Sequence, residues 1–367
     1  MYEGMITFAI ALATSFTATV PARQLAIRLD MLDWPGPRKV HSAPIPLLGG
    51  LGIYCGAVLA IVLSMDGQPR GQIFSILAAA TLLLIVGTLD DRGLLHHQVK
   101  LFVAMPLAAL TLLATGVRVH VFSAILVSGW VSGWASGWGP ALDAGLTLFW
   151  LVGVTAAFSI LDHMDGLTSG IAAIASFFFA LLSMIHGQVL VGTLATAVLG
   201  ASLGFLYWNF NPAKIFMGDG GAMFLGFMLA TLGAKLRLSG TSRFAWMVPV
   251  LVLAVPIFDT TLVSISRLRR GLVPFTSPGK DHTAHRLAKI GLGQRGAVLA
   301  LYGVGAFFGV MALLLGRVTL AKGNALVAVL GLAALGAVGV LELSPYERQA
   351  AKESTGVNRS PTENCKT

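Results

Sequence analysis

Two aspartates three residues apart, Asp162 and Asp165, stand at the end of a long apolar run, in the segment 159–167 (SILDHMDGL). In a helix, side chains at this spacing share one face about one turn apart, and Gly166 allows the backbone to leave the helix. The simplest interpretation is a helix end with two solvated acids. The alternative is a site that this pair shares with acids at other boundaries.

Acids at two further boundaries favour the shared site. Asp90 and Asp91 follow the apolar run 73–89. Two adjacent carboxylates repel each other, so one is normally paired with a cation or used to hold a metal. Asp219 is enclosed by glycines in the segment 216–221 (FMGDGG), where a carboxylate can coordinate Mg²⁺ while the glycines admit a diphosphate. Solvated helix ends remain the alternative for both.

Cationic side chains suited to phosphate oxygens occur in the segment 33–46, which its prolines stiffen. Arg38, Lys39 and His41 are the donors. The alternative is a basic loop that touches anionic lipid.

A second basic segment, 266–295, contains His282 and His285 three residues apart. This spacing could bind zinc, but the neighbouring cations and the lack of cysteine favour an anion instead. A basic patch at the membrane surface is the alternative.

One further acid, Asp259, lies inside an apolar run, in the segment 256–261 (PIFDTT). An acid within a membrane is costly unless it is paired. Asp259 is therefore a candidate site residue or a partner for the cations of the nearby basic segment.

The composition predicts an all-α integral membrane protein. Of the 367 residues, 56% are hydrophobic and 11% are charged, and the mean hydropathy is +0.80, which leaves too little polar surface for a soluble globule. The two cysteines make a structural disulfide unexpected, and the N-terminus lacks the basic region of a cleavable signal. Eleven apolar runs have the length of membrane spans: 5–20, 46–64, 73–89, 101–116, 143–161, 168–185, 189–208, 222–234, 246–265, 296–316 and 325–343.

Charge sets the expected orientation. With eleven spans, one set of loops and the tail carry 18 Lys and Arg and the opposite loops carry 7. Treating 119–139, with its three Ser-Gly-Trp repeats, as a twelfth span would abolish this asymmetry, so we expect an interfacial loop there. The positive-inside rule then puts the N-terminus outside and the C-terminus in the cytoplasm. We expect one domain over residues 1–345 and a disordered tail over 346–367. The candidate acids and histidines all fall on the cytoplasmic side.

Carboxylates for Mg²⁺, glycines and cations at one membrane face predict phosphate chemistry between a soluble diphosphate and a lipid. The alternative is a non-catalytic membrane protein that binds or transports a lipid phosphate. A transporter would place its acids at mid-membrane depth, with paired broken helices and repeat symmetry. The net charge of +9 is explained by topology and phosphate binding, so nucleic acid is not an expected partner.

The motifs together resemble those of the polyprenyl-phosphate N-acetylhexosamine-1-phosphate transferases, which form glycosyltransferase family 4. The likeness covers most of the chain and is closer to the branch that transfers GlcNAc-1-phosphate than to the muramyl-pentapeptide branch. Two departures stand out: Ser159 occupies a position where the family usually has Asn, and the family's His-x-His-His cluster is one histidine short at 282–285. The matching segments are 38–41 with 46–50, Asp90-Asp91, 162–167, 212–219, 256–259 and 281–286.

The resemblance implies a Mg²⁺-dependent transfer, with Mn²⁺ as the alternative ion, at the cytoplasmic face of a bacterial-type inner membrane. The partners it implies are a UDP-N-acetylhexosamine, a polyprenyl phosphate and membrane lipid, and a homodimer is left open. The implied catalytic residues are Asp90, Asp91 and Asp219, and the implied metal residues are Asp219 and Ser159. The implied substrate-binding residues are Lys39, His41, Asp162, Asp165, Asn209, His282, His285 and Arg286.

Overall fold

The computed structural model describes residues 2–35, 43–95, 97–119, 138–238, 246–273, 279, 281–315 and 320–342. These residues form a helical bundle with one two-stranded hairpin, β1 (Leu32–Asp33) and β2 (Ile45–Pro46). The helices of the first half are α1 (Tyr2–Arg28), α2 (Gly49–Leu63), α3 (Arg70–Asp91), α4 (His97–Val99), the π-helical turn η1 (Lys100–Ala104), α5 (Met105–Ala114) and α7 (Gly139–Leu161). Those of the second half are α8 (Leu167–Ile185), α9 (Val189–Asn209), α10 (Gly218–Lys235), α11 (Met247–Val252), α12 (Ala254–Arg269), α13 (Thr283–Leu287), the π-helical turn η4 (Ala288–Leu292), α14 (Gly293–Leu315) and α15 (Leu320–Glu342).

The bundle is that of a multi-pass membrane protein, which confirms the predicted all-α membrane class. Within the described ranges, six helical segments are long and apolar enough to cross a membrane, and three shorter helices are apolar. Each of the eleven predicted runs overlaps a helix. The count of eleven spans and the orientation stay predictions. The Ser-Gly-Trp segment and the predicted tail lie outside the described residues.

The helix α10, which contains the short predicted span 222–234, lies at the centre of the bundle. All of its residues are buried except Asp219 and Lys235. Its glycines explain this position: a Cβ on Gly50 of α2 would lie 2.5 Å from the backbone of Gly221, so the two helices touch backbone to backbone. The same composition that lowers the hydropathy of α10 lets protein, rather than lipid, surround it.

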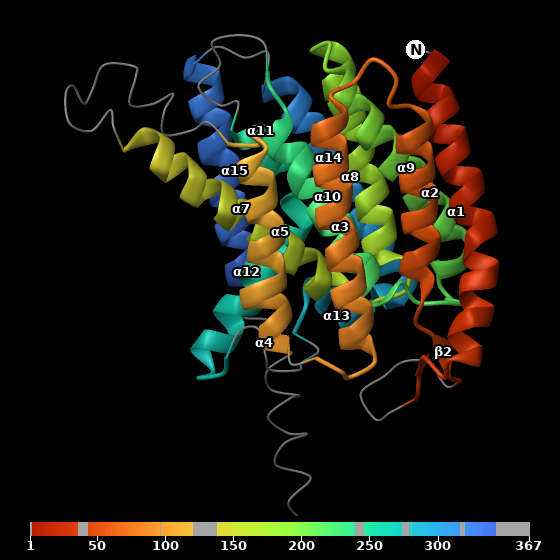
Figure 1. The fold of residues 1–367 in the computed structure, drawn as a ribbon. Helices are drawn as coiled ribbons and strands as arrows, with labels where there is room; N and C mark the ends of the chain where they lie inside the picture. The colour runs from red at the N-terminus through yellow and green to blue at the C-terminus, as the bar shows by residue number, and fades with distance from the viewer. Residues whose placement is uncertain are drawn as a thin grey trace, which may run out of the picture.

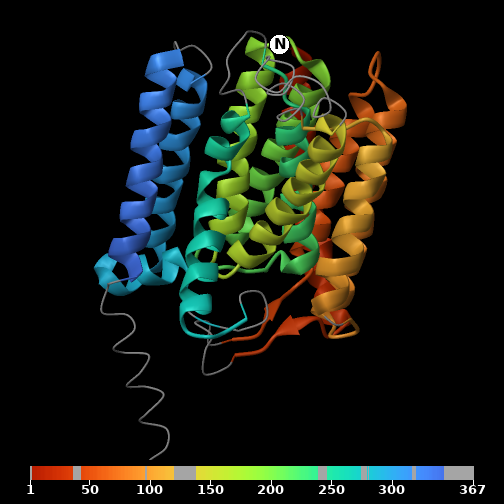
Figure 2. The same ribbon diagram turned by 90° about the vertical axis from the view of Figure 1, so that its left-hand side faces the viewer.

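The hairpin is tied to the segment that leads into α10. Its strands pair antiparallel, with Leu32 opposite Pro46. The Phe216 N–H donates to the Pro46 carbonyl at 2.8 Å, and the Gly50 N–H donates to the Met217 carbonyl at 2.9 Å. Figures 1 and 2 show this hairpin at the end of the bundle opposite the N-terminus, and α4 and α13 also lie at that end.

Candidate active site

Helix ends bring four acids together at the end of the bundle that carries the hairpin, and Lys100 pairs with two of them. We call Asp90, Asp91, Asp162 and Asp219, with Lys100 and Ser159, the acidic cluster. The Lys100 ammonium donates to Asp90 Oδ2 at 2.7 Å and also pairs with Asp219 Oδ2. One cation therefore bridges the end of α3 and the start of α10.

Asp91 holds the start of α10. Its carboxylate accepts hydrogen bonds from the backbone N–H of Asp219 at 3.0 Å and of Gly220 at 3.5 Å. A carboxylate in this place satisfies the free N–H groups of a helix N-terminus and interacts favourably with the helix dipole. Asp91 thereby fixes the backbone that carries Asp219.

Ser159 contacts the predicted metal ligand directly. Its hydroxyl, on the last turn of α7, donates to Asp219 Oδ1 at 2.9 Å. The residue that departs from the family pattern thus stands beside Asp219, as its predicted role requires.

Asp162 and Asp165 point to different partners. The prediction that they share a helix face is wrong, because α7 ends at Leu161 and Asp162 has a non-helical backbone with φ −80° and ψ 61°. Burial, and then the neighbouring Asp219, raises the pKa of Asp162 to about 8, which places it in the electrostatic field of the acidic cluster. Asp165 instead accepts from Asn211 Nδ2 at 2.9 Å and from the Ala213 N–H at 3.0 Å, so it fastens the connection between α9 and α10.

Two residues predicted to bind substrate have internal partners. Asn209 is 3% exposed; its amide accepts from the Gly166 N–H and donates to the Ile215 carbonyl, at 3.1 and 3.0 Å. Arg286 is 2% exposed and donates to Glu342 Oε1 at 2.8 Å, and also to Ser266 Oγ and two backbone carbonyls. In this structure both side chains brace the loops at this end of the bundle.

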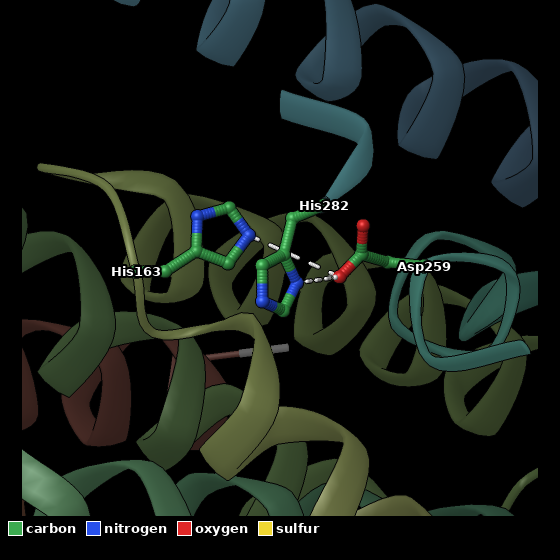
Figure 3. A group of neighbouring side chains, drawn as sticks. All are labelled: His163, Asp259 and His282. Carbon is green, nitrogen blue, oxygen red and sulfur yellow. Dashed lines mark hydrogen bonds and ion pairs between the residues drawn. The ribbon is translucent and has the colours of Figure 1, made fainter. Parts of the chain in front are cut away.

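A second group of side chains, His163, Asp259 and His282, lies at the same end, and we call it the histidine cluster (Figure 3). The ring of His163 stacks on that of His282 with ring centres 4.0 Å apart, and on that of His285 at 4.8 Å. Burial, and then the neighbouring His282 ring, lowers the pKa of His163, so this imidazole is neutral near pH 7.

Buried ion pairs hold the segment that carries His282. Asp281 accepts from Arg267 through both carboxylate oxygens, at 3.0 and 3.1 Å, and from Arg270 at 2.6 Å. Burial by itself would raise the pKa of Asp281, but the Arg267 guanidinium overcomes this and lowers it. The carboxylate therefore stays charged and fixes the position of the next residue.

The family model described as Glycosyl transferase family 4 matches residues 73–237. A protein of Bacillus subtilis (strain 168), named probable undecaprenyl-phosphate N-acetylglucosaminyl 1-phosphate transferase, is 34% identical over 87% of this chain and 87% of its own. The decaprenyl-phosphate N-acetylglucosaminephosphotransferase of Mycobacterium tuberculosis (strain ATCC 25618 / H37Rv) is 34% identical over 81% of this chain and 78% of its own. The undecaprenyl-phosphate alpha-N-acetylglucosaminyl 1-phosphate transferase of Escherichia coli (strain K12) is 27% identical over 76% and 75%. This chain belongs to glycosyl transferase family 4.

The family 4 match contains the whole acidic cluster and ends before Asp259 and His282. Together with the named relatives, this match confirms the resemblance drawn from the motifs. The protein is a transferase with the apolar helices of a membrane protein. The roles of the single residues stay predictions, and two of them, Lys39 and His41, lie outside the described residues.

The acidic cluster of this family 4 member fits a hard divalent cation. Carboxylate oxygens are the ligands that Mg²⁺ and Mn²⁺ prefer. The ammonium of Lys100 already lies between Asp90 and Asp219, which shows that this position stabilises positive charge. The hydroxyl of Ser159 orients one oxygen of Asp219, as outer groups do at metal sites.

Two residues at this end of the bundle escape prediction from the sequence. In the sequence, Lys100 resembles the other cations of the loops. Its position at the start of an apolar run, ten residues after Asp90, is the one feature that could have indicated a role in the site. His163 stands between the two aspartates of 162–165 and has no spacing to His282 that a sequence pattern could use. Tertiary contacts alone bring them to their partners.

Proposed function

We propose that this protein transfers an N-acetylhexosamine 1-phosphate, with GlcNAc-1-phosphate as the first candidate, from a UDP-sugar to a polyprenyl phosphate and releases UMP. The observation that carries the proposal is the convergence of three acids in a chain of glycosyl transferase family 4: Lys100 pairs with Asp90 and Asp219, and Asp91 accepts from the backbone N–H of Asp219. The named relatives act with undecaprenyl or decaprenyl phosphate, and those names give no support to a non-catalytic carrier.

In the proposed reaction, an oxygen of the polyprenyl phosphate attacks the β-phosphorus of the UDP-sugar. The bond between that phosphorus and the oxygen bridging to the α-phosphorus breaks, and UMP leaves with this oxygen. A phosphomonoester with a second pKa of about 6 is largely dianionic at neutral pH, so no strong general base is needed. In this reaction Asp90 would orient the acceptor phosphate or take its remaining proton.

The protein's part is positioning and electrostatics, as in phosphoryl transfer generally. Asp219 would hold the cation, with Ser159 orienting its Oδ1 and Asp91 fixing its backbone. When bound, Mg²⁺ supplies charge neutralisation on the donor's diphosphate. Lys100 keeps Asp90 and Asp219 together despite their like charges, and Asp162 would face the nucleotide.

We further propose an inner-membrane location with the hairpin end of the bundle in the cytoplasm, where UDP-sugars are made. The eleven-span topology, the single domain over 1–345 and the outside N-terminus belong to this proposal. The charge asymmetry of 18 against 7 Lys and Arg supports it.

The test is UMP release by purified protein incubated with undecaprenyl phosphate, Mg²⁺ and a panel of UDP-sugars. We expect release that requires both the lipid and the ion, with UDP-GlcNAc among the donors used. Protein that is folded but releases no UMP with any donor would overturn the proposal, as would release that does not require the lipid.

A further inference from the structure

The histidine cluster joins three segments that are distant in the sequence. His163 comes from the connection between α7 and α8, Asp259 from α12, and His282 from the residue before α13. Figure 3 shows nitrogens of both imidazoles directed at the carboxylate of Asp259. We infer that these three residues bind one divalent transition-metal ion of the class of Zn²⁺, separately from the acidic cluster and beyond the proposed transfer reaction.

The distances suit such an ion. His282 Nδ1 lies 2.9 Å and His163 Nε2 lies 3.9 Å from Asp259 Oδ2, and the three ligand atoms all lie within 4.8 Å of one another. Tetrahedral Zn²⁺ with bonds of about 2.0–2.1 Å places its ligand atoms about 3.3 Å apart. The two distances to Asp259 Oδ2 lie on either side of this value, and the separation of up to 4.8 Å within the cluster means that the two rings must turn toward each other for the ion to bind.

Two of the proposed ligand atoms, His282 Nδ1 and Asp259 Oδ2, are hydrogen-bonded to each other at 2.9 Å, and an ion between them would take the place of the shared proton. Both ring nitrogens of His163 are buried, and neither has a hydrogen-bond partner among the described residues. A buried polar atom without a partner is destabilising, and an ion at Nε2 would remove that cost. The N–H of Thr283 donates to Asp259 Oδ1 at 2.6 Å, which turns Oδ2 toward the imidazoles in the manner of the outer shell of a metal site.

The donor types select a different ion from the one expected at the acidic cluster. Two imidazole nitrogens and one carboxylate oxygen form a ligand set typical of Zn²⁺, whereas the all-oxygen acidic cluster suits Mg²⁺. Three protein ligands leave a fourth tetrahedral position for water or an anionic oxygen. An ion there would fasten the α7–α8 connection to α12 and to the segment before α13.

The number of metal ions bound per chain can be measured without any sugar nucleotide. Full-length, tag-free protein in detergent is stripped with EDTA, dialysed against excess Mg²⁺ with a low concentration of Zn²⁺, and its bound metal is measured by mass spectrometry. We expect one Zn²⁺ per chain to be retained in the presence of Mg²⁺. Retention of no Zn²⁺ would overturn the inference.

Variants assign the ion to the cluster. We expect His163→Ala and His282→Ala each to weaken Zn²⁺ binding about tenfold or more, while His186→Ala, just after α8, binds as the wild type does. Asp219→Asn should also keep its Zn²⁺. Equal binding by the wild type and His163→Ala overturns the inference, and so does loss of Zn²⁺ in Asp219→Asn. Failure of the transfer reaction would leave all of these results unchanged.

Co²⁺ gives a measurement on the wild type that needs no variant to fold. Protein loaded with one Co²⁺ should show the visible absorption of a four-coordinate ion with nitrogen and oxygen ligands, and added Zn²⁺ should remove it. Co²⁺ that binds with only the weak absorption of a six-coordinate, oxygen-bound ion would contradict the assignment.

Discussion

In the acidic cluster the acids stand at the ends of long helices, with Asp91 closing α3 and Asp219 opening α10, and close contacts between glycines fix how these helices pack. In the histidine cluster only Asp259 lies within a helix of comparable length, and the two histidines lie in connections between helices. The second cluster therefore depends on hydrogen bonds and ion pairs, chiefly those of Asp281, for its shape. Helix packing therefore positions the side chains of the acidic cluster, whereas a network of ion pairs and hydrogen bonds positions those of the histidine cluster.

The largest effect expected at the acidic cluster is that of Asp219→Asn. This change removes the charge that would hold the cation while leaving a side chain of the same size, so we expect UMP release to fall about 1000-fold or more. Asp66→Asn is the control, because that acid is 96% exposed and forms a surface ion pair with Arg70. Turnover close to that of the wild type would remove Asp219 from the metal role.

The variant Arg267→Met tests whether ion pairs, rather than helix packing, hold the histidine cluster in place. Arg267 and Asp281 are 6% and 2% exposed, and breaking a buried ion pair from one side costs about 3–5 kcal/mol. We expect the melting temperature in detergent to fall by about 5 °C or more. The matched change Arg70→Met breaks an exposed pair and should shift it little. Equal melting temperatures for the two variants would show that helix packing alone also supports the histidine cluster.

Lys100→Met tests the cation inside the acidic cluster. Loss of its two charged hydrogen bonds should lower turnover about 10- to 100-fold. The half-saturating Mg²⁺ concentration should fall at the same time, because one competing positive charge is gone. Lys235→Met, at the other end of α10, is the control. A higher requirement for Mg²⁺ would show instead that Lys100 helps to assemble the ion site.

The smallest effect is expected at Ser159. Ser159→Ala removes one hydrogen bond to Asp219 Oδ1 and should reduce UMP release about tenfold. Ser159→Asn restores a donor of the kind usual in the family and should keep most of the activity. Complete loss in the Asn variant would mean that the site has been rebuilt around the smaller serine.

The sequence by itself determined the membrane class, the approximate positions of the helices and the list of acids, because hydropathy and helix boundaries are local properties. It also sufficed for the family resemblance, since the motifs of Asp90-Asp91, 162–167 and 212–219 can be read along the chain. The same motifs single out Asp219 as a candidate metal ligand.

Only the tertiary structure decided which residues meet. In the tertiary structure the glycine-rich α10 lies at the centre of the bundle, and Asn209 and Arg286 bond to other parts of the protein. Asp162 and Asp165 have different neighbours there. The tertiary structure also joined Lys100 to Asp219 and His163 to Asp259. Most of these contacts link positions far apart in the chain, and they depend on how closely helices approach, which no local pattern of residues encodes.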